Sequence, residues 1–332
     1  MDRPLRVLQS FPEPRPTTNP YLVMLRDALA EVPGLEVRTF SWRRALTGRY
    51  DVFHVHWPEI LVSGNGPLRT AVRRLLFAAL LLRLRLRRTA VVRTVHNLRP
   101  HQERSGAAAW LLRRAERRTS AHIRLNDRTP ATEGVWGATV VHGHYRGWFE
   151  QHPHQASRPG HLVFAGLVRS YKNVPGLVGA FTAADDPGLS LHVAGAPDSP
   201  ETGEQLRAAA GADERVRLTL RHLDDAELVA AVTEAELVVL PYRDMHNSGA
   251  ALLALSLDRP VLVPDNEVTA DLAAEVGPGW VHRYQGDLTA EVLRDALAAL
   301  RAEPRAPRPD LSRREWDGAA AAHVEVYRRA RR

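Results

Sequence analysis

The chain of 332 residues has a net charge of +7, is 44% hydrophobic and contains no cysteine, which predicts a soluble protein long enough for two domains. The lack of cysteine excludes disulfides, thiolate metal ligands and cysteine nucleophiles, and it favours a reducing compartment. Residues 1–150 hold 25 arginines against 12 acidic residues, whereas residues 151–332 hold 20 cations against 26 acidic residues. This basic first half is compatible with an anionic partner, either a membrane surface or a nucleic acid, and also with no partner.

Strand-like and helical segments alternate through the first half. A first strand runs straight from the N-terminus without an apolar signal segment, so we expect a cytoplasmic protein. A proline-rich loop, residues 12–20, follows this strand at the place where open α/β sheets bind ligands. A helix is expected over Tyr21–Val32. The strands expected in this half are 6–11, 35–40, 51–57, 91–97, 121–126 and 139–142.

Residues 67–88 combine seven arginines with ten leucine, valine or phenylalanine residues and contain no acidic residue. The apolar run is too short and too interrupted to span a bilayer, which takes about 20 apolar residues. The pattern fits an interfacial helix on anionic lipid, which would make the protein peripheral at the inner membrane face. It fits a buried crossover helix with outward-reaching arginines equally well.

The second half repeats the alternation, with strands expected at 161–166, 189–195, 216–221, 236–242 and 260–264. We therefore predict an α/β protein with two doubly wound, Rossmann-like parallel sheets that face each other across a cleft. A proline-containing stretch near residues 152–160 marks the boundary. The expected domains are 1–155 and 156–310, followed by a closing helix within 311–332.

The turn after the strand at 161–166 has the features of a phosphate site. Gly166 ends the strand, Arg169 and Lys172 stand three positions apart, and a periodic segment begins at Val174. Such a strand-to-helix turn presents unpaired N–H groups and the positive end of a helix. Lys172 is the only lysine in the chain, which suggests that a compact charge is needed there. A solvated helix start with two surface cations is the alternative interpretation.

A second small-residue helix start follows the strand at 236–242. Ser248 and Gly249 would allow an anion to approach bare amides closely. This motif is weak alone. Together with Arg169 and Lys172 on the same sheet, it predicts a cleft that holds a diphosphate.

At this point the chain resembles the GT-B glycosyltransferases, and within them the family-4-like group and bacterial glycolipid mannosyltransferases. The resemblance covers nearly the whole chain and is carried by residues 166–173, 193–195, 223–228, 240–242, 259–264, 315–316 and 327–329, with 54–59 and 94–101 in the first half.

The resemblance implies transfer of a hexose, such as mannose, from a GDP- or UDP-linked sugar to a saccharide, glycolipid or small-molecule acceptor, without a metal or cofactor. The residues it implies are His96, Glu59, Arg169 and Lys172 for catalysis. Asn247, Ser248 and Gly249 would join the two cations on the donor diphosphate. Gly166, Tyr171, Asn173, Tyr242 and His246 would hold the nucleoside and sugar. Asn19, Tyr21, His56, Trp57 and Asn97 would lie on the acceptor side.

One departure from the family pattern concerns two glutamates eight positions apart, whose places hold Met245 and Leu253. This departure leaves open whether the enzyme retains or inverts the anomeric configuration. Inversion would need a general base on the acceptor side, and Glu59 or Asp127 could provide it.

The histidines of the first half give no recognisable metal spacing. We interpret His96, at a strand end, as a group that reaches the donor sugar, with a structural role as the alternative. We expect His54 and His56 to point to opposite faces of their strand, so that they do not line one site.

Two other functions remain open. A non-catalytic basic module would bind membrane or nucleic acid, although we expect no nucleic acid partner. An epimerase or hydrolase of sugar nucleotides would use the same fold without an acceptor.

Overall fold

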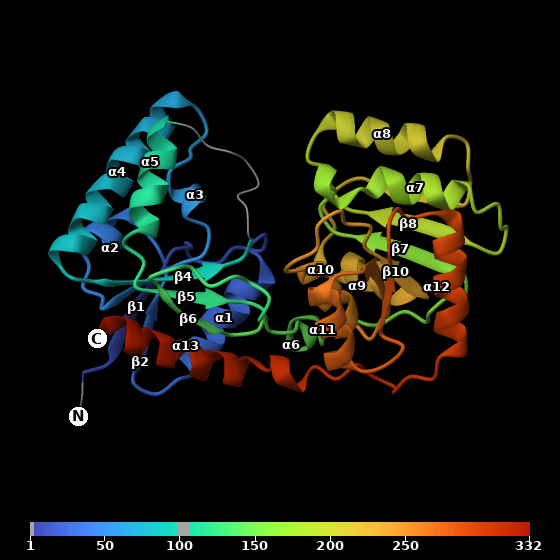
Figure 1. Cartoon of the computed structure of the whole chain (residues 1–332). Helices are drawn as coiled ribbons and strands as arrows, with labels where there is room; N and C mark the ends of the chain where they lie inside the picture. The colour runs from blue at the N-terminus through green and yellow to red at the C-terminus, as the bar shows by residue number, and fades with distance from the viewer. Residues whose placement is uncertain (1–2, 98–105) are drawn as a thin grey trace. The chain divides into compact units, whose positions relative to one another are not determined.

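The computed structural model describes residues 3–97 and 106–332 (Figure 1). Its contacts divide the chain into a first unit, Met1–Gly143 with Arg313–Arg332, and a second unit, His144–Ser312. Residues soon after 143 bond within the second unit: the Tyr145 amide donates to Ser256 Oγ at 2.9 Å, and Trp148 Nε1 donates to Asp225 at 2.9 Å.

The first unit contains one six-stranded, fully parallel sheet in the order β2-β1-β3-β4-β5-β6. Because β2 and β3 lie on opposite sides of β1, the chain direction across the sheet reverses between β1 and β3. Open α/β sheets bind ligands outside the carboxyl ends of the strands at this switch point. The strands are β1 (Leu5–Gln9), β2 (Leu35–Arg38), β3 (Val52–Val55), β4 (Ala90–Val95), β5 (Ala121–Arg124) and β6 (Trp136–Thr139).

Helices cover both faces of this sheet, as Figure 1 shows for α4 and α5 on one face and α13 on the other. Asn19 caps α1 and Pro20 occupies its first turn, so the proline-rich loop ends at a defined helix start. The helices are α1 (Pro20–Ala30), α2 (Trp42–Thr47), α3 (Pro58–Leu61), α4 (Pro67–Leu86), α5 (Gly106–Glu116) and α13 (Trp316–Arg331).

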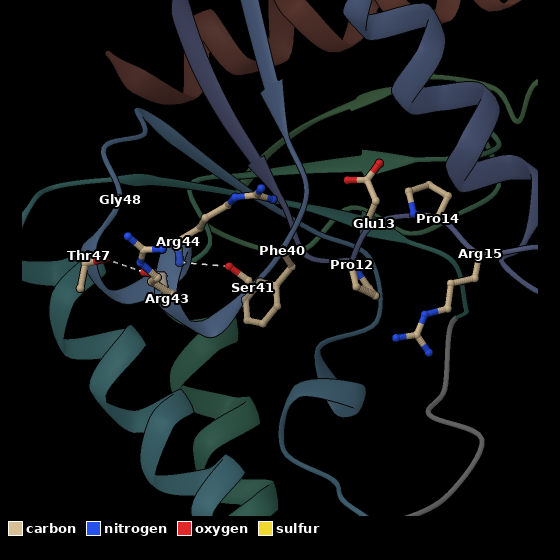
Figure 2. A pocket seen from close by; sticks show the side chains of 10 residues that line it. All are labelled: Pro12, Glu13, Pro14, Arg15, Phe40, Ser41, Arg43, Arg44, Thr47 and Gly48. Carbon is tan, nitrogen blue, oxygen red and sulfur yellow. Dashed lines mark hydrogen bonds between the residues drawn. The ribbon is translucent and has the colours of Figure 1, made fainter.

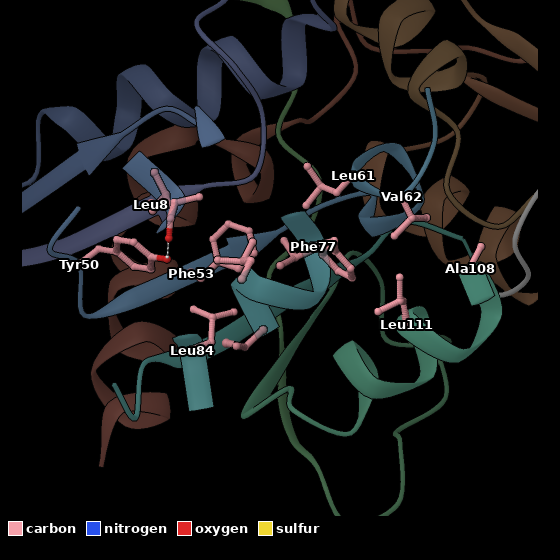
Figure 3. Close-up of a cluster of buried hydrophobic side chains, with 13 residues drawn as sticks. Leu8, Tyr50, Phe53, Leu61, Val62, Phe77, Leu84, Ala108 and Leu111 are labelled. Atoms are coloured by element: carbon pink, nitrogen blue, oxygen red, sulfur yellow. Dashed lines mark hydrogen bonds between the residues drawn. The ribbon is translucent and has the colours of Figure 1, made fainter. Parts of the chain in front are cut away.

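Helix α4 is the crossover between β3 and β4 and packs one face into the core. Its residues Phe77, Leu80 and Leu84 are buried against Phe53 and Leu111 (Figure 3). The side of α4 away from this core remains exposed. The buried face agrees with the interpretation of this segment as a crossover helix, and only the exposed side is available to a partner.

The second unit contains a second parallel sheet, in the order β12-β11-β10-β7-β8-β9. Its switch point lies between β7 and β10, the strands that precede the two predicted phosphate-binding turns. The edge strand β12 is absent from our sequence-based expectation. The strands are β7 (His161–Ala165), β8 (Ser190–Ala194), β9 (Val216–Thr219), β10 (Leu237–Val239), β11 (Val261–Pro264) and β12 (Val281–Tyr284).

Figure 1 shows α7 and α8 stacked over β7 and β8. The ends of β7 and β8 approach closely, since a Cβ on Gly195 would lie 1.9 Å from the carbonyl oxygen of Gly166. The helices of this unit are α6 (Arg146–Phe149), η1 (Ser170–Lys172), α7 (Val174–Thr182), α8 (Pro200–Ala210), α9 (Asp225–Glu234), α10 (Gly249–Ser256), α11 (Glu267–Val276) and α12 (Ala290–Ala302), with η2 (Ser312–Arg314) at the unit boundary.

In the described part of the chain, no helix is both long enough and apolar enough to cross a membrane.

Candidate functional site

The turn after β7 directs Lys172 into the second unit. Residues Ser170–Lys172 form the short helix η1, and Asn173 then adopts a left-handed conformation with φ of 50°. This conformation ends η1 and lets α7 begin at Val174. The Lys172 amide donates to the Arg169 carbonyl at 2.9 Å, which closes the turn. As a result only 9% of Lys172 is exposed.

Lys172 is a buried cation among aromatic rings. Its Nζ lies 5.2 Å from the centre of the Tyr242 ring and 5.7 Å from that of Phe164. Among the residues that the structure describes, no carboxylate forms an ion pair with it. Burial, and secondarily the charge of Arg169, lower the pKa of Lys172 to about 8. A cation buried without a counter-charge is costly, and a bound anion would relieve that cost.

The loop after β10 meets the turn after β7. The Arg243 amide donates to the Tyr171 carbonyl at 3.1 Å, and the rings of Tyr171 and Tyr242 lie 6.0 Å apart. The Tyr242 hydroxyl shares a hydrogen bond with Ser248, whose Oγ caps α10 by accepting from the Ala251 amide at 3.1 Å. The two predicted halves of the phosphate site are therefore neighbours.

The start of α10 leaves little room beside it, because a Cβ on Gly249 would lie 3.2 Å from the Tyr145 hydroxyl oxygen. His246 and Asn247 are half-buried on the loop that leads to α10. The Asn173 side chain lies against Gly176 in the first turn of α7. Two cations and the N-terminus of α10 therefore lie at the carboxyl ends of β7 and β10. Together these groups can bind a diphosphate.

The positions where the family pattern has glutamates carry no carboxylate. Met245 is buried, and its carbonyl accepts a hydrogen bond from Asn266 Nδ2 at 2.9 Å. Leu253 lies half-buried in α10. These positions therefore offer no acid that could contact a ribose or a sugar.

In the first unit, histidines gather at the switch point between β1 and β3. The rings of His54 and His56 lie 4.3 Å apart. Our expectation that they point to opposite faces is wrong, because residues two positions apart on a strand share a face. A hydrogen bond of 3.1 Å joins His56 Nδ1 to His96 Nε2.

These histidines belong to a buried series of hydrogen bonds that runs from β4 through α13 and β1. Each member is bonded through a side-chain atom to the next. The links are Thr94 Oγ1 to His54 Nε2 at 2.8 Å, His54 Nδ1 to Tyr327 OH at 2.7 Å, Tyr327 OH to Gln9 Nε2 at 3.4 Å, Gln9 Oε1 to His56 Nε2 at 3.1 Å, and His56 Nδ1 to His96 Nε2 at 3.1 Å.

Aromatic rings enclose His96. Trp57 stacks on it with 4.0 Å between ring centres, and Tyr21 meets it edge-on at 5.4 Å. Tyr21 also packs on His142 at 4.4 Å. Burial lowers the pKa of His96 well below its usual value and that of His56 to about 3, so both rings are neutral at neutral pH.

The other predicted first-unit residues are distributed around this cluster. Glu59 lies half-buried in the first turn of α3. Asn19 Oδ1 accepts from the Tyr21 amide at 3.0 Å and so caps α1. Asn97 directly follows His96, and residues 98–101 of the family-like segment lie outside the described residues. Asp127 forms an ion pair with Arg313 at 3.1 Å.

Sequence reasoning missed Gln9 and Tyr327 as members of the site. Gln9 is fully buried at the carboxyl end of β1, and Tyr327 is buried in α13. A polar residue that ends an apolar strand was an available signal for Gln9. For Tyr327 the sequence indicated a closing helix but not its partners, since only the fold brings α13 against β3 and β4.

An open cavity of about 850 Å³ lies farther along the same sheet edge, between the loop after β1 and the start of α2 (Figure 2). It combines an aromatic ring with several cations. Its lining residues are Pro12, Glu13, Pro14, Arg15, Phe40, Ser41, Arg43, Arg44, Thr47 and Gly48. Within the described residues, no three acidic or histidine side chains are grouped as metal ligands would be.

No protein-family model matches the chain. A curated relative from Xanthomonas campestris pv. campestris, GDP-mannose:glycolipid 4-beta-D-mannosyltransferase, is 43% identical over 323 residues, which are 97% of this chain and 92% of the relative. Among solved structures, sucrose-phosphate synthase from Thermosynechococcus elongatus aligns over 98% of both chains with a TM-score of 0.63 and 14% identity. Anabaena HepE in complex with UDP and glucose covers 98% of this chain and 95% of its own, with a TM-score of 0.61 and 13% identity.

Proposed function

Because this chain belongs to the GT-B glycosyltransferases, in the family of the Xanthomonas glycolipid mannosyltransferase, and transfers a hexose from a nucleotide sugar, we propose that its donor is GDP-mannose and its acceptor a lipid-linked saccharide. The extent of the alignment supports this choice, since it covers 97% of the chain. The observation that carries the proposed chemistry is the buried Lys172, which has no carboxylate partner among the described residues.

In this proposal, the second unit holds the diphosphate of the donor. Lys172 and Arg169 face the phosphates, and the amides at the start of α10 donate to them. When the bond between sugar and phosphate breaks, negative charge grows on the leaving diphosphate, and fixed cations stabilise that charge. We propose that these two cations make a metal ion or other cofactor unnecessary, so that a chelator leaves activity unchanged.

We further propose that the transfer inverts the configuration at the anomeric carbon, C1, of the sugar. The name of the relative specifies a β linkage, and an α-linked sugar nucleotide yields a β product by a single displacement. Such a displacement needs a base for the acceptor hydroxyl and no carboxylate nucleophile. The absence of acids at Met245 and Leu253 agrees with this requirement. His96 and Glu59 are the first-unit candidates for the base.

The cavity beside Phe40 is the proposed acceptor groove. The Phe40 ring can pack against a sugar, while Arg15 and Arg43 are exposed cations that can pair with the phosphate of a lipid carrier. Tyr21, Trp57 and Asn97 would contact the part of the acceptor nearest His96.

We also propose that the exposed side of α4 rests on an anionic membrane. Six apolar residues recur at alternating spacings of four and three, so they form one stripe along the helix. Three of them, Leu68, Leu75 and Leu86, are each more than 70% exposed. The stripe consists of Leu68, Val72, Leu75, Ala79, Leu82 and Leu86.

The charges around the stripe favour lipid over a second copy of the chain. Residues 67–88 contain seven arginines and no acid, and α5 adds exposed Trp110 and Arg114 nearby. Two such surfaces would repel each other, whereas anionic head groups would attract them. This contact would place the enzyme at the inner membrane face, beside a lipid-linked acceptor.

A product assay tests the proposed function. The protein is incubated with GDP-mannose, UDP-mannose, GDP-glucose or UDP-glucose, each with and without lipid-linked saccharide, and released nucleotide and glycolipid are measured by mass spectrometry. We expect GDP release and one added hexose only with GDP-mannose and acceptor. Nucleotide release or epimerised donor without acceptor would support a hydrolase or epimerase instead.

A further inference from the structure

The hydrogen bonds around Gln9 assign a proton position to each ring of the buried series. Gln9 directs its amide nitrogen to the Tyr327 hydroxyl and its amide oxygen to His56 Nε2. An amide oxygen only accepts, so His56 carries its proton on Nε2. Because the buried His56 is neutral, it has a single ring proton, and its Nδ1 is an acceptor.

The donor to His56 Nδ1 is therefore Nε2–H of His96. A neutral His96 with its proton on Nε2 has its lone pair on Nδ1. On the other side of Gln9, the Tyr327 hydroxyl accepts from the amide and donates its own proton to His54 Nδ1. His54 then donates from Nε2 to Thr94, so every link has one donor and one acceptor.

We infer that His96 is the general base of the transfer and that Gln9 and His56 are positioning residues which keep its proton on Nε2 and its lone pair on Nδ1. This inference rests on the proposed inverting reaction. Stacking of Trp57 on the ring fixes its plane, and the bond to His56 fixes its rotation within that plane. Within residues 3–97 and 106–332, no hydrogen bond or ion pair holds the Glu59 carboxylate in place.

The proposed step balances as follows. The acceptor oxygen attacks C1 of the donor sugar, and its proton passes to Nδ1 of His96. The new C1–O bond forms as the bond from C1 to the diphosphate oxygen breaks, and the electron pair leaves with the diphosphate. His96 becomes an imidazolium that still donates from Nε2 to His56, so the hydrogen-bond series stays intact during the step.

The groups that face His96 set the pH at which it works. His56 directly after β3, His142 after β6 and Arg93 on β4 all oppose a positive charge on its ring. The Tyr21 ring on α1 meets it edge-on. Burial first, and these neighbouring charges second, lower the pKa of His96 and keep it unprotonated at neutral pH, as a base requires.

The first test observes the proton directly. Ring ¹⁵N chemical shifts of the ¹⁵N-histidine-labelled protein, assigned with His96→Gln, distinguish a protonated from an unprotonated nitrogen. We expect His96 to show an unprotonated Nδ1 and a protonated Nε2 at pH 7.5. The reverse pattern would overturn the inference. This experiment uses no substrate, so its result stands even if the proposed donor is wrong.

The second test uses variants at Gln9. Gln9→Met removes the acceptor for His56, and we expect kcat to fall at least about tenfold with an unchanged KM for the donor, because a base in the wrong tautomer is ineffective. Gln9→Glu retains an acceptor and adds a negative charge. It should keep more activity than Gln9→Met and move the acid limb of the kcat profile to higher pH.

Thr94→Val is the matched control, since it removes the last link of the same buried series but leaves the links from Gln9 to His96. We expect it to keep kcat within about threefold of the wild type. Equal losses in Gln9→Met and Thr94→Val, or a Gln9→Met enzyme with wild-type kcat and pH profile, would contradict the positioning role. Should Gln9→Met fail to fold, the tautomer measurement on the wild type decides alone.

Discussion

The ammonium nitrogen of Lys172 lies 5.2 Å from the centre of the Tyr242 ring, which joins the turn after β7 to the loop after β10. Tyr242 in turn bonds to Ser248 at the start of α10. The cation, the ring and the helix start are therefore joined by direct contacts at the switch point of the second sheet. In the part of the chain that the structure describes, no carboxylate pairs with Lys172, and a bound anion would offset the cost of burying its charge.

Donor binding should weaken as the pH rises through the pKa of Lys172. Burial lowers this pKa to about 8, so the ammonium group is mostly charged at pH 7 and mostly neutral at pH 9. We expect the affinity for GDP, measured by calorimetry, to fall roughly tenfold between these values if the charged form alone binds well. The arginine of the Lys172→Arg variant stays charged at pH 9. Any GDP binding by this variant should therefore be equally strong at pH 7 and pH 9.

The same burial predicts that Lys172→Met makes the protein without ligand more stable. The folded pKa of about 8 lies below the usual value of 10.5, so the cost of burying the ammonium group is complete below about pH 8 and fades as the pH rises towards 10.5. Removing it should raise the free energy of unfolding at pH 7 by about 1–3 kcal/mol. Urea unfolding measures this difference. A loss of stability of similar size would show that the lysine supports the fold.

The first unit should lose stability at a higher pH than that at which exposed carboxylates become protonated. Burial lowers the pKa of His56 to about 3 and those of His142 and His323 to about 4. Below pH 6.5, these histidines therefore bind protons in the unfolded chain but not in the folded chain. The free energy of unfolding falls as the pH decreases. Each such histidine contributes a slope of about 1.4 kcal/mol per pH unit. Urea midpoints at pH 7.5, 6 and 5 should decline steadily, and constant midpoints would contradict these shifts.

Sedimentation with vesicles tests the exposed side of α4. The wild type should bind vesicles that contain phosphatidylglycerol, less at high salt, and not bind neutral vesicles. Leu75→Gln with Leu82→Gln should abolish most binding, because both side chains are exposed on the stripe. Leu167→Gln, at an exposed leucine of the second unit, is the control. Equal binding by the double variant, or stronger retention on nucleic acid than on vesicles, would exclude this contact.

Much of the fold could be predicted from local patterns, because buried parallel strands are short apolar runs that end at glycine or polar residues. Gly166 and Ser248 were predicted at the correct turns for this reason, and the observed strand order places both at a switch point. The strand β12 was missed because its four residues, Val281–Tyr284, alternate in burial at the sheet edge.

The first-unit site was harder to predict because its partners are distant in sequence. Gln9 and Tyr327 belong to opposite ends of the chain and meet only when α13 packs on the first sheet. No local pattern carries that information. The separation of His54 from His56 was an error of strand geometry, whereas their bonds to Tyr327 and Gln9 required the fold.

Calorimetric titration of GDP at pH 7 into the wild type, Lys172→Met and Arg207→Met tests the donor site most directly. Arg207 lies on α8 and is the control for loss of a cation. We predict binding by the wild type and Arg207→Met, and at least about tenfold weaker binding by Lys172→Met. Equal affinity in all three proteins would contradict the assignment of the diphosphate to the turn after β7.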